Sequence, residues 1–296
     1  MLRRLIRAFR TVQAPQSPAP APAPAPAPTV SPLWCGLQDA ALDGWFLQDS
    51  GELLKGFPIA ASDVVLDVGC GDGMATLFAA RQGASVIFSD TEADKVEALS
   101  EQPQLGQARH AQGLVSDSNP LPLEAGTASK VICLEVLEHV DDPAQVMAEL
   151  VRVGKPGAQY LLSVPDPVGE QLQQGIAPDA YFQSPNHVRI FSREDFATLV
   201  ENAGLQIEHR QASGFFWVMN MIFYWAAEKA AGRGLQGAVR DQVVDSQLPL
   251  MNDWAQTWKR LLDNAEGVSI KRQLDQLMPK SQVIIARKPA QESSTR

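Results

Sequence analysis

Two carboxylates and three glycines follow the first strongly apolar segment of the chain. Residues 64–68 read as a buried strand, Val-Val-Leu-Asp-Val, and residues 69–73 are Gly-Cys-Gly-Asp-Gly. Glycine has no Cβ and tolerates positive φ, so a ligand can approach this backbone closely. Dinucleotide sites hold a pyrophosphate with G-x-G-x-x-G, whereas this spacing is G-x-G-x-G beside Asp67 and Asp72. Two carboxylates repel a diphosphate and suit a ligand with a cationic sulfonium or amino end.

A second apolar segment, Ser85 to Asp90, also ends in an acid. A helical run over residues 74–82 separates it from the first segment. Asp90 lies about 20 residues beyond the glycine turn, where doubly wound sheets place a carboxylate for the hydroxyls of a ribose. The two segments together favour a nucleoside with a positive charge as the ligand.

From Val64 to Gly204 the chain resembles the class I S-adenosylmethionine (SAM)-dependent methyltransferases, in the branch that acts on small molecules or glycans. Three further segments match in the expected order. Ser116-Asp117 with residues 121–123, Leu-Pro-Leu, is similar to the Gly-Asp…Leu-Pro-Phe segment that contacts adenine. Residues 131–140 resemble the fourth strand with its Leu-Glu-His-Val ending, and residues 155–165 resemble the Lys-Pro-Gly turn and fifth strand. Two departures are Ser116 in place of glycine and Ser129-Lys130 in place of Phe-Asp.

The resemblance implies an α/β fold with a doubly wound, seven-stranded, mostly parallel Rossmann-like sheet. Residues 205–211 and 282–288 read as its last two strands, which the family pairs antiparallel at one edge of the sheet. Between these strands the chain carries an unusually long helical insertion. Asp142-Pro143 predict the start of one helix, and Ser192 predicts the N-cap of another.

The resemblance also assigns the cofactor, SAM, and the residues that bind it. Asp90 is expected to bind the ribose, Asp117 the adenine amine and Glu135 the amino group of the methionine part. Glu138 is expected to face solvent or to cap a helix. The cofactor-binding residues that the resemblance implies are Asp67, Gly69, Cys70, Gly71, Gly73, Asp90, Thr91, Ser116, Asp117 and Glu135.

Two histidines are candidates to take the proton of a hydroxyl acceptor. His139 follows the fourth strand, at the sheet edge where open α/β folds bind ligands, and its unperturbed pKa of about 6.5 suits a general base. His187 lies in a segment that the resemblance places over the mouth of the active site. Either histidine could instead be structural, as His139 is in some members of the family. Asp141 is a candidate to orient His139.

Composition narrows the class of protein. The net charge of −9 argues against a general grip on nucleic acid, which needs a basic face. Three widely spaced cysteines, Cys35, Cys70 and Cys133, favour buried thiols in a reducing, cytoplasmic compartment. With four histidines that do not cluster with cysteine in the sequence, we predict no metal site.

The chain begins with four arginines and no acid in its first ten residues. Apolar residues at positions 2, 5, 6, 9 and 12 have helical spacing, which predicts a short basic amphipathic helix. Such a helix would bind an anionic membrane surface weakly and reversibly, at about 1 kcal/mol per arginine. The alternative is a disordered tail that contacts nothing. The alternating Ala-Pro residues that follow favour a polyproline II spacer.

We predict six parts of the chain. They are a basic helix over 1–13, a linker over 14–32, a methyltransferase core over 33–212, a helical insertion over 213–280, the last core strand within 281–290 and a tail over 291–296. Residues 33–61 read as helical. The insertion opens with an apolar run over residues 215–225 that is too short to cross a bilayer. We favour a buried or lid helix here over a dimer contact or a membrane wedge.

The sequence therefore predicts a SAM-dependent methyltransferase. Its acceptor is expected to be the oxygen of a small molecule, a glycan or a lipid-linked compound, handled in the cytoplasm and in part at the inner face of the membrane. One alternative is a non-catalytic methyltransferase-like module that binds a partner through its insertion. Another is a nicotinamide dehydrogenase, which the glycine spacing disfavours.

Overall fold

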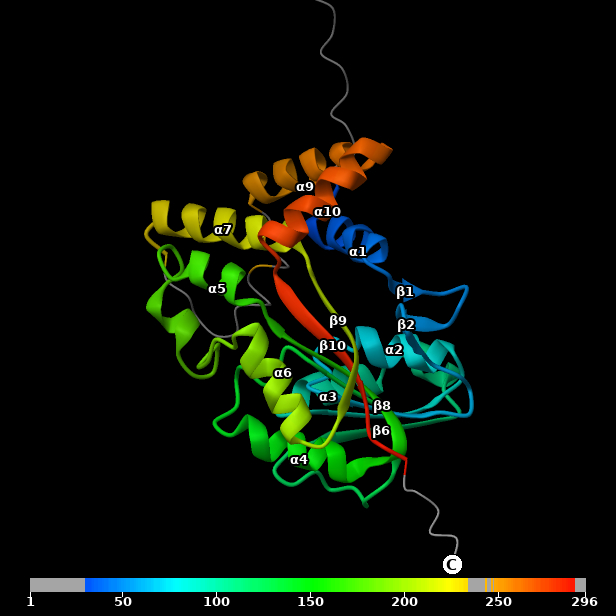
Figure 1. Ribbon diagram of the computed structural model, residues 1–296. Helices are drawn as coiled ribbons and strands as arrows, with labels where there is room; N and C mark the ends of the chain where they lie inside the picture. The colour runs from blue at the N-terminus through cyan, green and yellow to red at the C-terminus, as the bar shows by residue number, and fades with distance from the viewer. Residues whose placement is uncertain (1–29, 234–242, 244–245, 247, 291–296) are drawn as a thin grey trace, which may run out of the picture.

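A seven-stranded sheet forms the centre of the computed structural model, which describes residues 30–233, 243, 246 and 248–290 (Figure 1). The strand order is β6-β5-β4-β7-β8-β10-β9. The strands are β4 (Val64–Val68), β5 (Ser85–Asp90), β6 (His110–Val115), β7 (Ala128–Leu134), β8 (Gly154–Pro165), β9 (Gln206–Ser213) and β10 (Ser281–Arg287). This architecture confirms the predicted doubly wound α/β fold. The expected helix over 1–13, most of the linker and the tail over 291–296 lie outside the described residues.

Parallel pairing sets the position of the site. Strand β4 pairs in parallel with β5 on one side and with β7 on the other, and these pair with β6 and β8. The chain thus adds β5 and β6 on one side of β4, and it then returns to add β7 and β8 on the other side. Ligands of such sheets bind at the carboxyl ends of the strands where the order reverses, here at the tips of β4 and β7. Strand β10 is antiparallel to both β8 and β9, as predicted.

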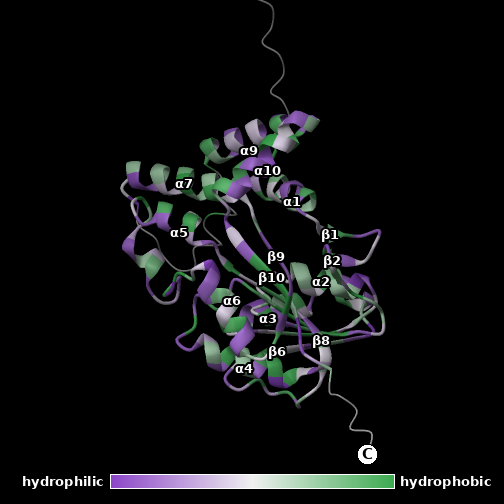
Figure 2. Cartoon of the chain, viewed as in Figure 1, coloured by the Kyte–Doolittle hydropathy of each residue, from purple (hydrophilic) through white to green (hydrophobic). Residues whose placement is uncertain are grey.

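Helices cover both faces of the sheet. Helices α2 (Met74–Arg81) and α3 (Ala93–Ser100) pack on one face, and α4 (Pro143–Val153) and α6 (Arg193–Asn202) pack on the other. Side chains alternate along each strand, so Leu66 and Val68 join the core under α4 while Val65 joins the core under α2. Figure 2 shows the hydrophobic residues that run along these central strands.

The predicted helix starts are confirmed. The Asp142 carboxylate accepts hydrogen bonds from the backbone N–H groups of Ala144 and Gln145, both at 3.0 Å, and Pro143 begins α4. The Ser192 hydroxyl accepts from the N–H of Asp195 at 3.0 Å and starts α6. A further helix, α5 (Pro167–Gln173), follows β8, with two short 3-10 turns at Pro103–Gln107 and Asp179–Phe182.

The prediction of helix throughout residues 33–61 was wrong. Only α1 (Pro32–Leu42) is helical, and a small antiparallel sheet follows it. Its strands are β1 (Trp45–Leu47), β2 (Glu52–Leu54) and β3 (Phe57–Pro58). Gly44, Gly51 and Gly56 adopt φ values of 90°, 69° and 91°, which turn the chain back on itself where a helix would need φ near −60°.

Three helices form a cap with α1 at one end of the sheet (Figure 1). They are α7 (Phe215–Ala230), α9 (Pro249–Leu262) and α10 (Ala265–Leu277), all within the expected insertion. Phe216 stacks on Trp254 with ring centroids 5.8 Å apart, and Trp258 is buried beside them. The apolar run over 215–225 therefore lies largely inside the cap. No helix among the described residues is both long and apolar enough to span a bilayer.

A buried cation ties α1 to α10. The Lys271 ammonium is fully buried and lies 2.7 Å from the Asp43 carboxylate, 2.6 Å from Asp275 and 3.5 Å from Asp39. Asp275 also accepts from the N–H groups of Gly214 and Phe215, where α7 begins. One ammonium thus contacts three carboxyl groups, which come from α1, its C-terminal end and α10.

We expect Lys271→Met to lower the free energy of unfolding by about 3–5 kcal/mol, because it leaves several buried carboxylates without a counter-ion. Urea unfolding followed by tryptophan fluorescence measures the effect. The control is Lys259→Met, which removes the partly exposed pair with Asp263 and should cost about 0.5 kcal/mol or less. Equal effects of the two substitutions would contradict a role for the buried cluster in stability.

Candidate active site

The glycine loop after β4 requires its glycines. Gly69, Gly71 and Gly73 have φ values of 70°, 49° and 79°. A Cβ on Gly69 would lie 2.3 Å from a Val136 methyl group, and one on Gly73 would lie 2.2 Å from a Leu99 methyl group. The N–H groups of Gly69 and Cys70 donate to the Ser89 carbonyl at 2.8 and 2.9 Å, which fastens the loop to β5. The loop therefore presents bare backbone at the reversal point of the sheet.

Two of the predicted acids brace this loop. The Asp67 carboxylate is buried and accepts from the Thr76 hydroxyl of α2 at 2.6 Å. Burial raises the pKa of Asp67 to about 6, against the effect of the Thr76 hydrogen bonds. Asp90 is half-buried and accepts from the N–H groups of Gly71 at 3.0 Å and Glu92 at 3.1 Å. Asp90 thus lies at the mouth of the loop, and Asp67 lies beneath it.

The remaining predicted cofactor residues on this side follow β5 and β6. The N–H of Ser116 donates to the Asp90 carbonyl at 2.9 Å, which brings the tip of β6 beside that of β5. Asp117 is exposed, and its carboxylate accepts from the N–H of Asn119 at 3.0 Å. Thr91 is exposed directly after Asp90, and Cys70 is buried within the loop. The sheet edge therefore brings these predicted residues together.

Glu135, at the tip of β7, has a cationic partner that the sequence analysis missed. Its φ of 56° is unusual for a residue with a side chain. The carboxylate accepts from the Ser163 hydroxyl at 2.9 Å and forms an ion pair with Lys280. Burial acts to raise the pKa of Glu135, but the Lys280 ammonium outweighs it and the pKa is lowered.

Lys280 reaches the site because it directly precedes the antiparallel strand β10. Its N–H donates to the Ser213 carbonyl and its carbonyl accepts from the N–H of Asp166, both at 2.9 Å. An antiparallel strand begins at the edge of the sheet where its parallel neighbours end. The predicted direction of the last strand therefore already indicated that the residue before it, Lys280, lies at the ligand edge.

The expectation that Glu138 faces solvent or caps a helix was wrong. Its side chain is fully buried, and among the described residues neither carboxylate oxygen has a hydrogen-bond partner. Its backbone carbonyl accepts from the N–H of Val188 at 3.0 Å, so the segment after β8 and α5 packs over it. Burial, followed by the charge of Glu135, raises the pKa of Glu138 well above its usual value.

The two predicted histidines lie side by side, with ring centroids 5.0 Å apart. His139 Nδ1 lies 3.0 Å from the carbonyl oxygens of Pro185 and Asn186. Because carbonyls only accept, Nδ1 carries the hydrogen. His139 Nε2 lies 3.7 Å from the Glu138 carboxylate. Burial and then the neighbouring His187 lower the pKa of His139, which favours the neutral ring.

These contacts replace the orienting role suggested for Asp141. The Asp141 carbonyl instead accepts from Arg189 at 3.1 Å. His187 has a different kind of partner from His139, because its Nδ1 lies 2.8 Å from the buried carboxylate of Glu170 on α5. The sequence analysis did not single out Glu170.

Glu138, His139 and His187 are also residue types that hold metal ions. One potential ligand atom from each lies within 4.8 Å of the other two. The prediction of no metal site considered spacing along the sequence, whereas His139 and His187 meet only through the fold. A second acidic group, Asp39, Asp43 and Asp275, already surrounds the Lys271 ammonium.

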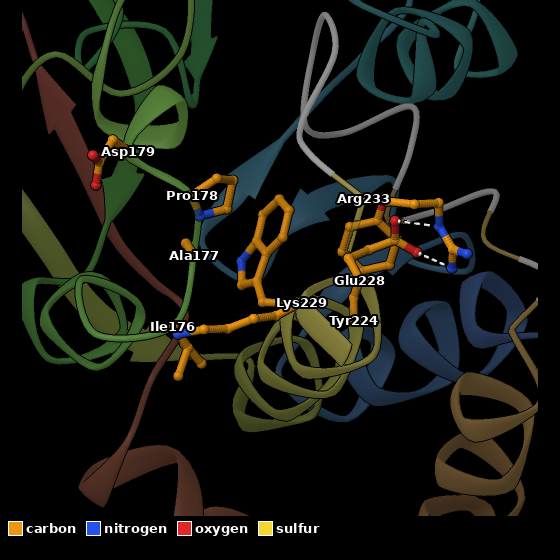
Figure 3. A pocket seen from close by; sticks show the side chains of 9 residues that line it. Ile176, Ala177, Pro178, Asp179, Tyr224, Glu228, Lys229 and Arg233 are labelled. Carbon is orange, nitrogen blue, oxygen red and sulfur yellow. Dashed lines mark hydrogen bonds and ion pairs between the residues drawn. The ribbon is translucent and has the colours of Figure 1, made fainter. Parts of the chain in front are cut away.

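A hollow of about 310 Å³ lies between residues 176–179 and the C-terminal part of α7. Figure 3 shows the Lys229 side chain of α7 extending toward Ile176, while Glu228 of the same helix is paired with Arg233. Trp225 lines the hollow and contacts Tyr181, whose ring in turn lies 4.6 Å from that of His187. The rings of Trp225 and Tyr181 thus lie between the hollow and the histidine pair.

Comparison with known proteins identifies the family to which the chain belongs. The methyltransferase domain family matches residues 45–210, more than half of the chain. Ubiquinone biosynthesis O-methyltransferase of Pseudomonas paraeruginosa is 39% identical over 104 residues, which cover 35% of this chain and 44% of that protein. The protein of the same name from Xanthomonas axonopodis is 30% identical over 151 residues, covering 49% and 63%. The chain thus spans about half the length of the curated relatives it matches.

Two solved structures show the same fold at low identity. A geranyl diphosphate methyltransferase in complex with SAM is 18% identical with a TM-score of 0.52, covering 85% of this chain and 86% of that one. A [4+2]-cyclase is also 18% identical, with a TM-score of 0.51 and coverage of 87% and 81%. The fold therefore hosts more than one activity, and the family assignment rests on the sequence match. By that match over residues 45–210, this chain belongs to the methyltransferase domain family.

Proposed function

We propose that the chain is a SAM-dependent methyltransferase that transfers a methyl group to an oxygen of a small-molecule acceptor. The observation that carries the proposal is the glycine loop after β4, where a Cβ on Gly69 or Gly73 would clash, beside the carboxylates of Asp90 after β5 and Asp117 after β6. This edge suits a cationic nucleoside and repels a diphosphate. The names of the curated relatives favour a hydroxylated quinone precursor as acceptor, with a glycan or lipid-linked hydroxyl as further members of the class.

Several of the predicted residues would have a role in this reaction. Asp90 would bind the ribose hydroxyls and Asp117 the adenine amine, while Gly69, Gly71 and Gly73 let the methionine part lie against the backbone. Glu135 would bind the amino group while it keeps its ion pair with Lys280. SAM supplies an electrophilic methyl group, so the protein has mainly to align the acceptor oxygen with it and to remove the proton.

We expect the full-length protein to bind SAM in isothermal titration calorimetry, and Asp90→Ala to weaken binding at least about tenfold. The loss follows from removing charged hydrogen bonds to the ribose, each worth about 1.5–3 kcal/mol. The control is Glu97→Ala, which removes an exposed acid of α3 that has no such position. An absence of binding to the intact protein would overturn the proposed cofactor.

The alternative of a non-catalytic binding module makes a different prediction. A methyltransferase should transfer labelled methyl from SAM to at least one member of a panel of phenols, sugars and lipid-linked hydroxyl compounds. Removal of whichever candidate histidine is the general base, by His139→Ala or His187→Ala, should then lower the rate about 10²–10⁴-fold while SAM affinity is retained, because a general base acts on the chemical step. His209→Ala, on exposed strand β9, is the matched control. SAM binding without transfer to any acceptor would favour the binding module.

The basic segment at the start of the chain supports a weak contact with the inner face of the membrane. We expect the full-length protein to float with vesicles of anionic lipid at low salt, and a variant that lacks residues 1–13 to stay in the dense fraction. About 0.5 M salt should release the full-length protein, because it screens the arginines. Equal flotation of the two proteins would remove this segment from the membrane proposal.

A further inference from the structure

Glu170 is a buried carboxylate that the reaction described above does not use. It lies on α5, and one of its oxygens accepts from the Tyr181 hydroxyl at 2.8 Å. The other oxygen lies 2.8 Å from His187 Nδ1. Both oxygens are therefore engaged, and one of their partners is a candidate catalytic ring.

The protonation states around Glu170 follow from these contacts. Burial and then the Glu170 carboxylate raise the pKa of Tyr181 well above its usual value, so its hydroxyl stays protonated and donates. Two donors approach one oxygen of the Glu170 carboxylate, the Tyr181 hydroxyl at 2.8 Å and the Gln173 amide nitrogen at 3.4 Å. A carboxylate that faces donors in this way accepts on its other oxygen too, so the geometry places the hydrogen of that contact on His187 Nδ1. When the ring is neutral, its lone pair is then on Nε2.

The network continues from Glu170 into the helical cap. The Gln173 side chain accepts from the indole N–H of Trp225 on α7 at 2.9 Å. Its amide nitrogen lies 3.4 Å from the Glu170 carboxylate. Trp225, Gln173 and Tyr181 are all at most 2% exposed. Such a buried and connected network has one favoured arrangement, so α7 helps to fix the His187 ring.

We propose that Glu170 is a positioning residue that holds His187 in the Nδ1–H tautomer, so that Nε2 accepts the proton of the acceptor hydroxyl. The inference rests on the proposed methyltransferase function. The O–H bond of the acceptor breaks and its proton moves to His187 Nε2 as the oxygen bonds to the methyl carbon. The bond from that carbon to the sulfonium breaks, and its electron pair leaves on sulfur. The resulting imidazolium lies against the Glu170 carboxylate, which offsets its charge.

The Nδ1 hydrogen of His139 has a different kind of partner from that of His187. It is bonded to carbonyl dipoles rather than to a carboxylate, and the pKa of His139 is lowered. The geometry therefore assigns the proton to His187 and leaves His139 to face the buried Glu138 and help shape the site.

Nitrogen-15 NMR of the histidine rings tests the tautomer without an acceptor or SAM. The full-length protein is labelled at its four histidines and recorded at about pH 8.5, above the usual titration range of imidazole, with EDTA present. His187→Gln identifies the His187 signals. We expect the pattern of a neutral ring protonated on Nδ1. A proton on Nε2 of His187 would overturn the proposal, whether or not the protein binds SAM.

A pair of variants tests the role of the carboxylate. Glu170→Leu combined with Tyr181→Phe removes both buried partners, so that no polar group is left unpaired between them. It is compared with Tyr181→Phe alone, which keeps the carboxylate. Relative to that single variant, the double variant should move His187 toward the Nε2–H tautomer, while His139 keeps its proton on Nδ1. Its kcat for the best acceptor of the panel should fall about 10²–10⁴-fold, with KM for SAM within about twofold.

Two results would overturn the assignment. One is an unchanged His187 tautomer and kcat in the double variant relative to Tyr181→Phe. The other is a shift of the His187 signals on addition of one equivalent of Zn²⁺ without EDTA, together with methyl transfer that then depends on the cation, because Nε2 would be a metal ligand. Failure of SAM binding in calorimetry would instead remove the proposed function, and the NMR result would still report the tautomer.

Discussion

Parallel pairing of β4 with both β5 and β7 is the constraint on which the site depends. It brings the ends of strands from distant parts of the sequence to one edge and leaves a gap in connectivity where a ligand can lie. The glycine loop is then fastened to β5 through the Ser89 carbonyl and the Asp90 carboxylate. The Asp90 side chain, which is proposed to bind the ribose, thus also braces the loop.

The part of the site around the end of β7 and α5 contains three glutamates, whose negative charges must be offset or suppressed. Glu135, Glu138 and Glu170 come from β7, the turn after it and α5, and two of them are almost completely buried. Lys280 offsets part of this charge and His187 occupies one oxygen of Glu170, while Glu138 has no hydrogen-bond partner among the described residues. Burial disfavours a charge on Glu138, so its pKa rises instead. The charged groups of this half of the site thus come from the end of β7 and the turn after it, from α5 and the segment that follows it, and from Lys280 before β10.

The cap lies beyond the part of the chain that matches the family. The family match ends at residue 210, and α7, α9 and α10 lie beyond it. They are held together by aromatic stacking and by the buried Lys271 cluster, and the Trp225 indole of α7 donates to Gln173 on α5, the helix that carries Glu170. A shared core with a separate cap fits the general rule that fold does not fix function and that sites are built onto folds.

The sequence by itself determined the parallel core, the glycine loop after β4 and the positions of the acids beside it, because glycine spacing, strand-terminal acids and helix caps are local signals. Val64–Val68, Asp90, Asp142 and Ser192 all have the predicted positions in their elements. It could not place Glu138 inside the protein, pair Glu135 with Lys280 or find Glu170 beside His187, because these contacts join residues far apart in the chain. Nor did the apparent helical character of residues 33–61 reveal the small sheet, since the three glycines that turn the chain there act through backbone conformation. Tertiary structure decided which of the predicted histidines has a carboxylate behind it, since burial and long-range packing choose the partner of each ring.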